Sequence, residues 1–126
     1  MTPDPPNGLA LIVGESETSN EILRHILELE GWRVLLARSG GEALAMGLHT
    51  SPDLVITDVE MRRMDGVELA RALNSREPST TILALTPRPD AVASPNPFEA
   101  VLRKPVSVPA IRRWVAALKP GGSGES

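Results

Sequence analysis

The sequence predicts an α/β fold, a doubly wound parallel sheet that carries helices on both faces. Five short apolar runs alternate with helical patterns along the 126 residues, and strands that alternate with helices pair as a parallel sheet through right-handed crossovers. One of these runs, residues 54–57, is apolar almost throughout, which is typical of a strand covered on both faces. The length suffices for one domain with a core of its own and is too short for two.

Composition and charge exclude several classes of protein. With 41% hydrophobic residues and a formal net charge of −3, the chain is an ordinary globular protein. Its weak negative charge argues against direct nucleic-acid binding, which needs a basic surface. The chain contains no cysteine, so disulfides and thiolate metal sites are excluded. Because the sequence shows neither a membrane span nor a signal-peptide pattern, we expect a cytoplasmic protein without a membrane partner.

The first half of the chain supplies three strands and two helices. The strand at 9–13 leads into a polar loop in which Ser16, Thr18 or Ser19 could cap the next helix. Gly31 ends that helix, and residues 34–37 form the second strand. The predicted buried face of the helix consists of Ile22, Leu23, Ile26, Leu27 and Leu29. A weaker helix then opens at Ser39-Gly40-Gly41 and precedes the apolar strand at 54–57.

The second half is unusual in the segment between its two strands. A helix follows the turn at Asp65-Gly66, and strands are predicted at 81–85 and 100–103. Between these strands, residues 87–97 hold four prolines. Proline removes a backbone donor and disfavours helix for the residue before it. We therefore predict a fourth helix that is missing or shortened to a single turn.

The last helix and the two ends complete the predicted domain. The helix has an apolar stripe made of Val108, Ile111, Val115 and Leu118. A run of proline, glycine and serine follows it, and three prolines lie before the first strand. The predicted domain covers residues 9–118, and we expect residues 1–8 and 119–126 to be flexible.

Polar side chains stand at the carboxyl ends of four predicted strands. The four are Glu15 after the first strand, Asp58 at the end of the third, Thr86 at the end of the fourth and Lys104 after the fifth. Because the carboxyl ends of parallel strands meet at one edge of the sheet, we expect these side chains to converge. Carboxylates hold hard cations such as Mg²⁺ and can form acyl phosphates, while amines and hydroxyls stabilise the transferring oxygens. The pattern predicts a site for a cation and a phosphoryl group, with Asp58 as the nucleophile.

The stretches that carry these residues resemble the receiver domain of two-component response regulators, the CheY-like family. They read LIV-GE after the first strand, DLVITDVEM and MDG around Asp58, LALT at Thr86 and LRKP at Lys104. The resemblance covers about residues 9–118 and implies a flavodoxin-like sheet of five parallel strands in the order 2-1-3-4-5. Asn20 and the ending FEAVLRKP look most like receivers attached to hybrid histidine kinases.

The resemblance also implies a role for each site residue. Asp58 would accept a phosphoryl group from the histidine of a sensor kinase or of a phosphotransfer protein. Glu15, Asp58 and the backbone carbonyl of Glu60 would bind Mg²⁺. Thr86 would move toward the new phosphoryl group, and Lys104, often followed by a cis peptide bond in this family, would pair with it. Such a protein is a phosphoacceptor signalling domain rather than an enzyme. It switches the binding of a downstream protein target, with homodimer formation left open.

The sequence departs from the receiver pattern at several positions. Gly14 stands where the family usually has a second acidic residue, so Mg²⁺ should bind more weakly. Pro87 follows Thr86 and lacks the N–H that would contact a phosphoryl oxygen; losing a hydrogen bond to a charged group costs about 1.5–3 kcal/mol. Arg62-Arg63 adds positive charge near the mouth of the site, where we expect a solvated pair. Val101 replaces a common aromatic switch residue.

Three functions therefore compete. The first is a working receiver, in which phosphorylation of Asp58 shifts a two-state equilibrium. The second is a pseudo-receiver, a protein-interaction module that acts without phosphorylation. The third is an aspartyl-phosphate phosphatase of the haloacid dehalogenase type; it ranks last because that family needs an aspartate where this chain has Glu60. For the first reading we also hypothesise a salt bridge between Glu60 and Arg88 that would screen the acyl phosphate from water.

Overall fold

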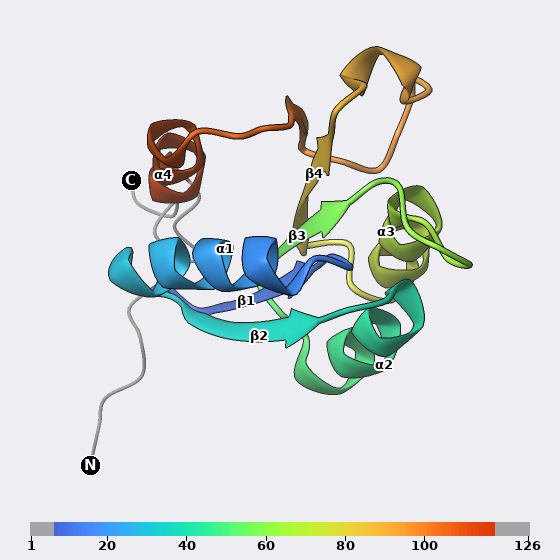
Figure 1. The fold of residues 1–126 in the computed structure, drawn as a ribbon. Helices are drawn as coiled ribbons and strands as arrows, with labels where there is room; N and C mark the ends of the chain where they lie inside the picture. Colours follow the sequence, from blue (N-terminus) through green and yellow to red (C-terminus); the bar gives the residue numbers. More distant parts are fainter. Residues whose placement is uncertain (1–6, 118–126) are drawn as a thin grey trace.

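A computed structural model describes residues 7–117, which form a five-stranded sheet between two layers of helices (Figure 1). The strands are all parallel and lie in the order β2-β1-β3-β4-β5. Their bounds are Leu9–Val13 for β1, Arg33–Ala37 for β2, Leu54–Asp58 for β3, Thr81–Thr86 for β4 and Ala100–Arg103 for β5. The predicted fold class and strand order are confirmed, and each strand lies within one residue of its predicted bounds.

Four α-helices of the described residues cover the sheet in pairs (Figure 1). Their bounds are Glu17–Leu29 for α1, Gly40–Thr50 for α2, Gly66–Arg76 for α3 and Val108–Ala117 for α4. Helices α1 and α4 pack on one face, and α2 and α3 pack on the other. Between β4 and β5 the chain forms only one short 3₁₀ turn, Pro89–Ala91. The prolines of this segment have the predicted effect, because the helix usual at this place in the family is reduced to that turn.

Local capping explains where the helices near the site begin. The Ser16 side chain accepts a hydrogen bond from the backbone N–H of Ser19, and this selects Ser16 among the predicted caps of α1. Asp65 starts α3 with a capping box, in which Asp65 and Glu68 each accept from the other's backbone N–H at 2.9 and 3.0 Å. These caps fix the two loops that enter the carboxyl edge of the sheet, one after β1 and one after β3.

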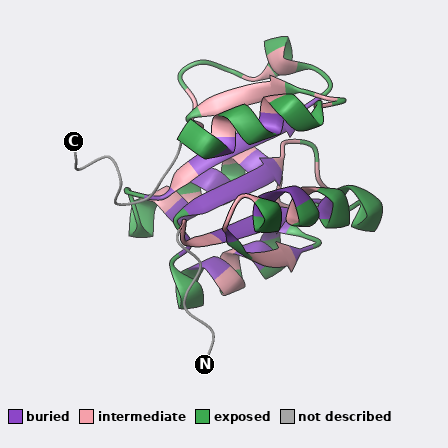
Figure 2. Cartoon of the chain, turned by 90° about the vertical axis from the view of Figure 1, so that its left-hand side faces the viewer, coloured by how far each residue is buried: buried purple, intermediate pink, exposed green. Residues whose placement is uncertain are grey.

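The core lies in two layers, one on each side of the central strands. Figure 2 shows buried strands between helices whose outer faces are exposed. On the α1/α4 side, Trp32 is 3% exposed and Trp114 packs against the same core cluster, so both tryptophans are packing residues. The predicted apolar face of α1 needs a correction, because Ile22 is 53% and Leu29 73% exposed. Both residues line a surface pocket together with Val108 at the start of α4 instead of packing into the core.

The ends of the predicted domain are only partly described. The backbone N–H of Asn7 donates to the carbonyl of Gly31 at 3.2 Å, which ties the lead-in to the end of α1. Leu118, the last residue of the predicted domain, and the predicted flexible tail at 119–126 lie outside the described residues, as do residues 1–6. Within residues 7–117, no helix combines the length and the apolar character needed to cross a membrane.

Candidate functional site

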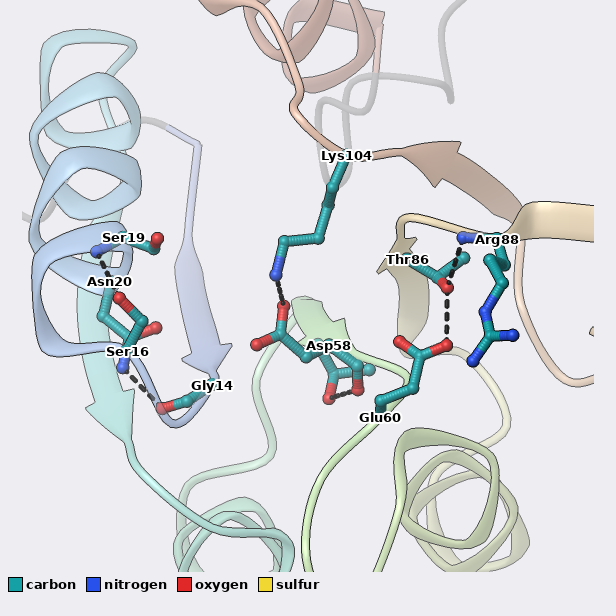
Figure 3. A network of polar contacts seen from close by, with 10 residues as sticks. Gly14, Ser16, Ser19, Asn20, Asp58, Glu60, Thr86, Arg88 and Lys104 are labelled. Carbon is teal, nitrogen blue, oxygen red and sulfur yellow. Dashed lines mark hydrogen bonds and ion pairs between the residues drawn. The ribbon is translucent and has the colours of Figure 1, made fainter.

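The carboxyl edge of the sheet brings the predicted site residues together. In the register of the sheet, Asp58 lies beside Leu85 and Thr86 lies beside Arg103. The ends of β3 and β4 and the residue after β5 therefore point into one region, as Figure 3 shows for Asp58, Thr86 and Lys104. Gly14, in the loop after β1, and Asn20, in α1, lie on the side of Asp58 opposite Thr86 (Figure 3).

Asp58 and Lys104 form the centre of the site. Lys104 Nζ lies 3.1 Å from Asp58 Oδ1, although the residues are 46 positions apart in the chain. The side chain of Asp58 is 17% exposed and that of Lys104 is 35% exposed, so the pair is shielded but reachable from solvent. The Lys104–Pro105 peptide bond is cis, as the resemblance implied. Chemically, a carboxylate beside a fixed ammonium can act as a nucleophile, with the ammonium offsetting negative charge that develops next to it.

The environment of Asp58 disfavours its charge. Burial raises the pKa of the Asp58 carboxyl above its ordinary value, and Lys104 opposes that rise through its hydrogen bond and its charge. The carboxylates of Glu60 and Glu15 add to the rise by repulsion. Asp58 is thus a partly desolvated carboxyl whose charged form is disfavoured by burial and favoured by Lys104.

Gly14 leaves room for the Asp58 side chain. A Cβ at position 14 would lie 2.8 Å from Asp58 Oδ2 and 2.9 Å from Asn20 Oδ1, which is closer than real Cβ contacts. Asn20, only 3% exposed, donates from Nδ2 to the Gly14 carbonyl at 2.9 Å. The glycine therefore does more than remove one predicted cation ligand, because Asp58 and Asn20 occupy the space that a side chain at position 14 would need.

Glu15 points to a different partner from the one predicted. Its Oε2 accepts from the backbone N–H of Arg62 at 2.9 Å and from Arg62 Nε at 3.3 Å. The hydrogen bond from the Arg62 backbone lowers the pKa of the Glu15 carboxyl, and the arginine side chain contributes further. This contact joins the loop after β1 to the loop after β3. The expectation of a solvated Arg62-Arg63 pair is wrong for Arg62, which binds Glu15 while its side chain stays 88% exposed.

Thr86 and Glu60 form a contact that the sequence did not reveal. Thr86 is fully buried, and its Oγ1 donates to Glu60 Oε2 at 2.7 Å. The same oxygen accepts from the backbone N–H of Arg88 at 3.0 Å. The hypothesised Glu60–Arg88 salt bridge is wrong, since no ion pair joins these residues within 4.0 Å in the described chain. Glu60 is held by the threonine hydroxyl instead, as Figure 3 shows.

Asn20 and Arg62 are the two site residues that reasoning from sequence missed in these roles. In the sequence, Asn20 indicates only a likeness to receivers of hybrid histidine kinases. Its place one turn into α1 puts it next to the loop after β1. For Arg62, the sequence indicates only a positive charge near the mouth of the site. Its contact with Glu15 spans 47 positions and depends on how two loops approach each other, which no local pattern reports.

Comparison with known proteins identifies this arrangement. The family model for the response regulator receiver domain matches residues 10–114. The chain belongs to the response regulator receiver domain family. Response regulator MprA from Mycobacterium sp. (strain KMS) is 41% identical over 78 residues, which cover 62% of this chain and 34% of that protein. The chain thus spans about a third of the length of this curated relative.

Solved receiver domains show the same fold. The signal receiver domain of a signal transduction histidine kinase from Syntrophus aciditrophicus is 30% identical, with a TM-score of 0.77, covering 94% of this chain and 95% of that chain. The receiver domain from hybrid histidine kinase CckA shares the fold at 23% identity, with a TM-score of 0.75, covering 88% of this chain and 98% of that chain. This receiver is therefore a signalling domain of a two-component system, not a member of the phosphatase class ranked third.

The predicted Mg²⁺ ligands can be tested against the geometry of this receiver. Receiver domains generally bind Mg²⁺. Within residues 7–117, however, no three His, Cys, Asp or Glu side chains are grouped so that they could hold a metal. Glu15 is engaged by Arg62, Asp58 by Lys104, and position 14 has no side chain. A divalent cation could use Glu15 as a ligand only after Glu15 leaves Arg62.

Proposed function

We propose that this receiver accepts a phosphoryl group on Asp58. The observation that carries the proposal is the 3.1 Å contact between Asp58 Oδ1 and Lys104 Nζ at the carboxyl edge of the sheet. The ammonium holds one carboxylate oxygen, and the side chain remains 17% exposed, so a donor can reach it. Thr86, at the end of the neighbouring strand, supplies a hydroxyl on the other side of the same site.

The chemical step needs no redox partner. A lone pair of an Asp58 carboxylate oxygen forms a new O–P bond, and the P–N bond of a phosphohistidine breaks with its electron pair staying on the histidine nitrogen. Lys104 neutralises part of the negative charge on the transferring oxygens. The 3.1 Å contact between Asp58 and Lys104 supports the roles given to these two side chains. Catalysis here is mainly positioning and charge compensation.

The partners follow from this chemistry. The donor is a histidine on a sensor kinase or on a histidine phosphotransfer protein, and the output is altered binding to a downstream protein. Because Glu15 is held by Arg62 and Gly14 offers no carboxylate, we expect Mg²⁺ to bind weakly. During transfer from the phosphohistidine, the negative charge of the phosphoryl group is therefore offset chiefly by Lys104.

Phosphoramidate tests the proposal, because it carries the same P–N bond as phosphohistidine. The chain is incubated with phosphoramidate and Mg²⁺, and intact mass is followed over time. Wild type should gain one phosphoryl group, and Asp58→Asn should gain none. A gain of equal size in Asp58→Asn would place the acceptor elsewhere and overturn the assignment.

A second candidate function is a phosphate-independent interaction module. Two observations favour it. Glu15, the expected cation ligand, is bound by Arg62. Pro87, next to Thr86, has no backbone N–H to donate to a phosphoryl oxygen. In this case wild type would gain no phosphoryl group even at millimolar Mg²⁺. Its binding to a partner would then be the same for wild type and Asp58→Asn.

A further inference from the structure

The hydroxyl of Thr86 has a single hydrogen, and that hydrogen is already in use. Oγ1 donates to Glu60 Oε2 at 2.7 Å and accepts from the backbone N–H of Arg88 at 3.0 Å. A hydroxyl has one donor, so it cannot donate to Glu60 and to an anion on Asp58 at once. Thr86 is also fully buried, so no solvent competes for this hydrogen.

The two residues after Thr86 offer no free backbone donor toward the site. Pro87 has no backbone N–H. The N–H of Arg88 is directed to Thr86 Oγ1. The hydroxyl of Thr86 is thus the donor at the end of β4 itself, and Glu60 holds it.

Glu60 lies two residues after Asp58 and faces the same site (Figure 3). Its carboxylate would therefore meet an incoming anion in two ways. It competes for the one hydroxyl hydrogen, and it repels the anion by its charge. Both effects act in the same direction, against an anion bound on Asp58.

We infer that Glu60 is a positioning residue that holds the Thr86 hydroxyl away from Asp58, so that an anion on Asp58 gains this hydrogen bond only when the Glu60 carboxylate releases it. This inference rests on the proposed function of Asp58 as phosphoacceptor. In the resting protein Glu60 acts as a latch, and its release is part of the cost of switching. Residue 60 thereby sets how readily the receiver enters its phosphorylated conformation.

Beryllofluoride, formed from beryllium and excess fluoride with Mg²⁺, tests the latch as a phosphoryl mimic on the full chain. Its affinity is measured by amide NMR for wild type, Glu60→Gln and Glu60→Ala. The amide oxygen of Gln still accepts the Thr86 hydrogen but carries no charge, whereas Ala removes the acceptor. The latch predicts that Glu60→Ala binds about tenfold more tightly than Glu60→Gln, the upper end of the scale for a hydrogen bond between neutral groups. Equal affinities of the two variants would mean that only the charge of Glu60 matters and would overturn the inference.

Repeating the comparison in a Thr86→Ala protein tests whether the effect of Glu60 depends on the Thr86 hydroxyl. In Thr86→Ala the hydrogen is gone, so Glu60→Ala and Glu60→Gln should bind beryllofluoride equally; a persisting tenfold difference would contradict the latch. Glu99→Ala is the matched control, because it removes an exposed carboxylate whose side chain makes no hydrogen bond or ion pair in residues 7–117. Its affinity should equal that of wild type.

A measurement without ligand separates the latch from the proposed function. Scalar couplings of the Thr86 side chain report one rotamer in wild type and in Glu60→Gln, and rotamer averaging in Glu60→Ala. Unchanged couplings in Glu60→Ala would overturn the latch whatever binds at Asp58. If no protein, wild type included, binds beryllofluoride, the phosphoacceptor proposal falls and takes the inference with it; if all bind with equal affinity, only the inference falls.

Discussion

The centre of this site and its two flanks are held in different ways. At the centre, Asp58 and Lys104 come from the ends of strands and pair with each other at 3.1 Å. On the flanks, Glu15 binds Arg62 and Thr86 binds Glu60, so residues expected to serve a cation or an anion are engaged by other parts of the protein. The centre thus keeps the receiver arrangement, whereas on each flank a residue of the loop after β3, Arg62 or Glu60, engages the residue expected to serve the site.

This difference teaches where a receiver can change without losing its fold. The register of β3, β4 and β5 fixes the backbone positions at the centre, and moving them would disturb buried strands. Loop side chains are constrained only by their own partners. Departures from the family pattern, such as Gly14 in place of an acidic residue and Pro87 in place of a residue with a backbone N–H, can therefore alter the flanks while the Asp58–Lys104 pair remains.

The largest effect is expected from breaking the centre. Lys104→Met removes the ammonium beside Asp58, and the rate of phosphoryl gain from phosphoramidate should fall about 10²-fold, the scale for losing a charge-stabilising donor. Arg103→Met is the control, because it removes a neighbouring positive charge that contacts the Pro87 carbonyl rather than Asp58. Equal rates in Lys104→Met and wild type would mean that the centre does not depend on the pair.

The second largest effect is expected at Gly66, which packs against the backbone of Asp58 and Val59. A Cβ at Gly66 would lie 2.3 Å from the Asp58 carbonyl oxygen and 3.0 Å from Val59 Cα. Because these are backbone atoms, Gly66→Ala should lower the free energy of unfolding by about 3 kcal/mol, measured by urea denaturation. Gly41, also in a first helical turn, has nothing within 4 Å of its Cβ position. Gly41→Ala should be neutral or stabilising by about 0.5 kcal/mol, and a similar loss at both positions would contradict this explanation.

The loop side of Asp58 should respond more mildly. A Cβ at Gly14 meets the ends of two side chains, Asp58 and Asn20, which can rotate away. We expect Gly14→Ala to cost about 1 kcal/mol and to shift the amide resonances of Asp58 and Lys104. A variant as stable as Gly41→Ala, with unshifted resonances, would show that the close approach at position 14 is unimportant.

The ionisation of Asp58 gives a pH-dependent test of the centre. Burial raises the folded-state pKa of Asp58, so the folded protein takes up this proton more readily than the unfolded chain. The stability from this group is then fully present below its unfolded pKa and is lost as pH rises through its folded pKa. Asp58→Asn should therefore gain stability relative to wild type as pH rises through that range, measured by urea denaturation at several pH values. A stability difference that shrinks with rising pH would have the wrong sign.

The smallest effect is expected at the Glu15–Arg62 contact. Arg62→Ala keeps the backbone N–H that Glu15 accepts and removes an arginine side chain that is 88% exposed. Exposed ion pairs contribute little, so stability should be unchanged within error. Affinity for Mn²⁺, followed by paramagnetic broadening of amide signals, should rise about twofold at most. Arg63→Ala, which leaves the contact intact, is the control; a large gain in Arg62→Ala alone would show that the side chain rather than the backbone closes this flank.

The sequence alone determined the succession of strands and helices and the residues at the strand ends. Apolar runs, caps and prolines act over a few neighbouring residues, so Asp58, Thr86 and the loss of the helix after β4 could be located without coordinates. The parallel order of the sheet followed from the resemblance, and the convergence at its carboxyl edge followed from the crossovers.

Only the tertiary structure decided which side chains bind each other. Glu15 pairs with Arg62 across 47 positions, and Thr86 pairs with Glu60 across 26. The exposure of Ile22 and Leu29 is likewise a matter of packing between elements, which the apolar stripe of α1 does not report. Such contacts depend on rotamers and on the approach of separate loops, and the spacing of residues along the chain carries no information about either.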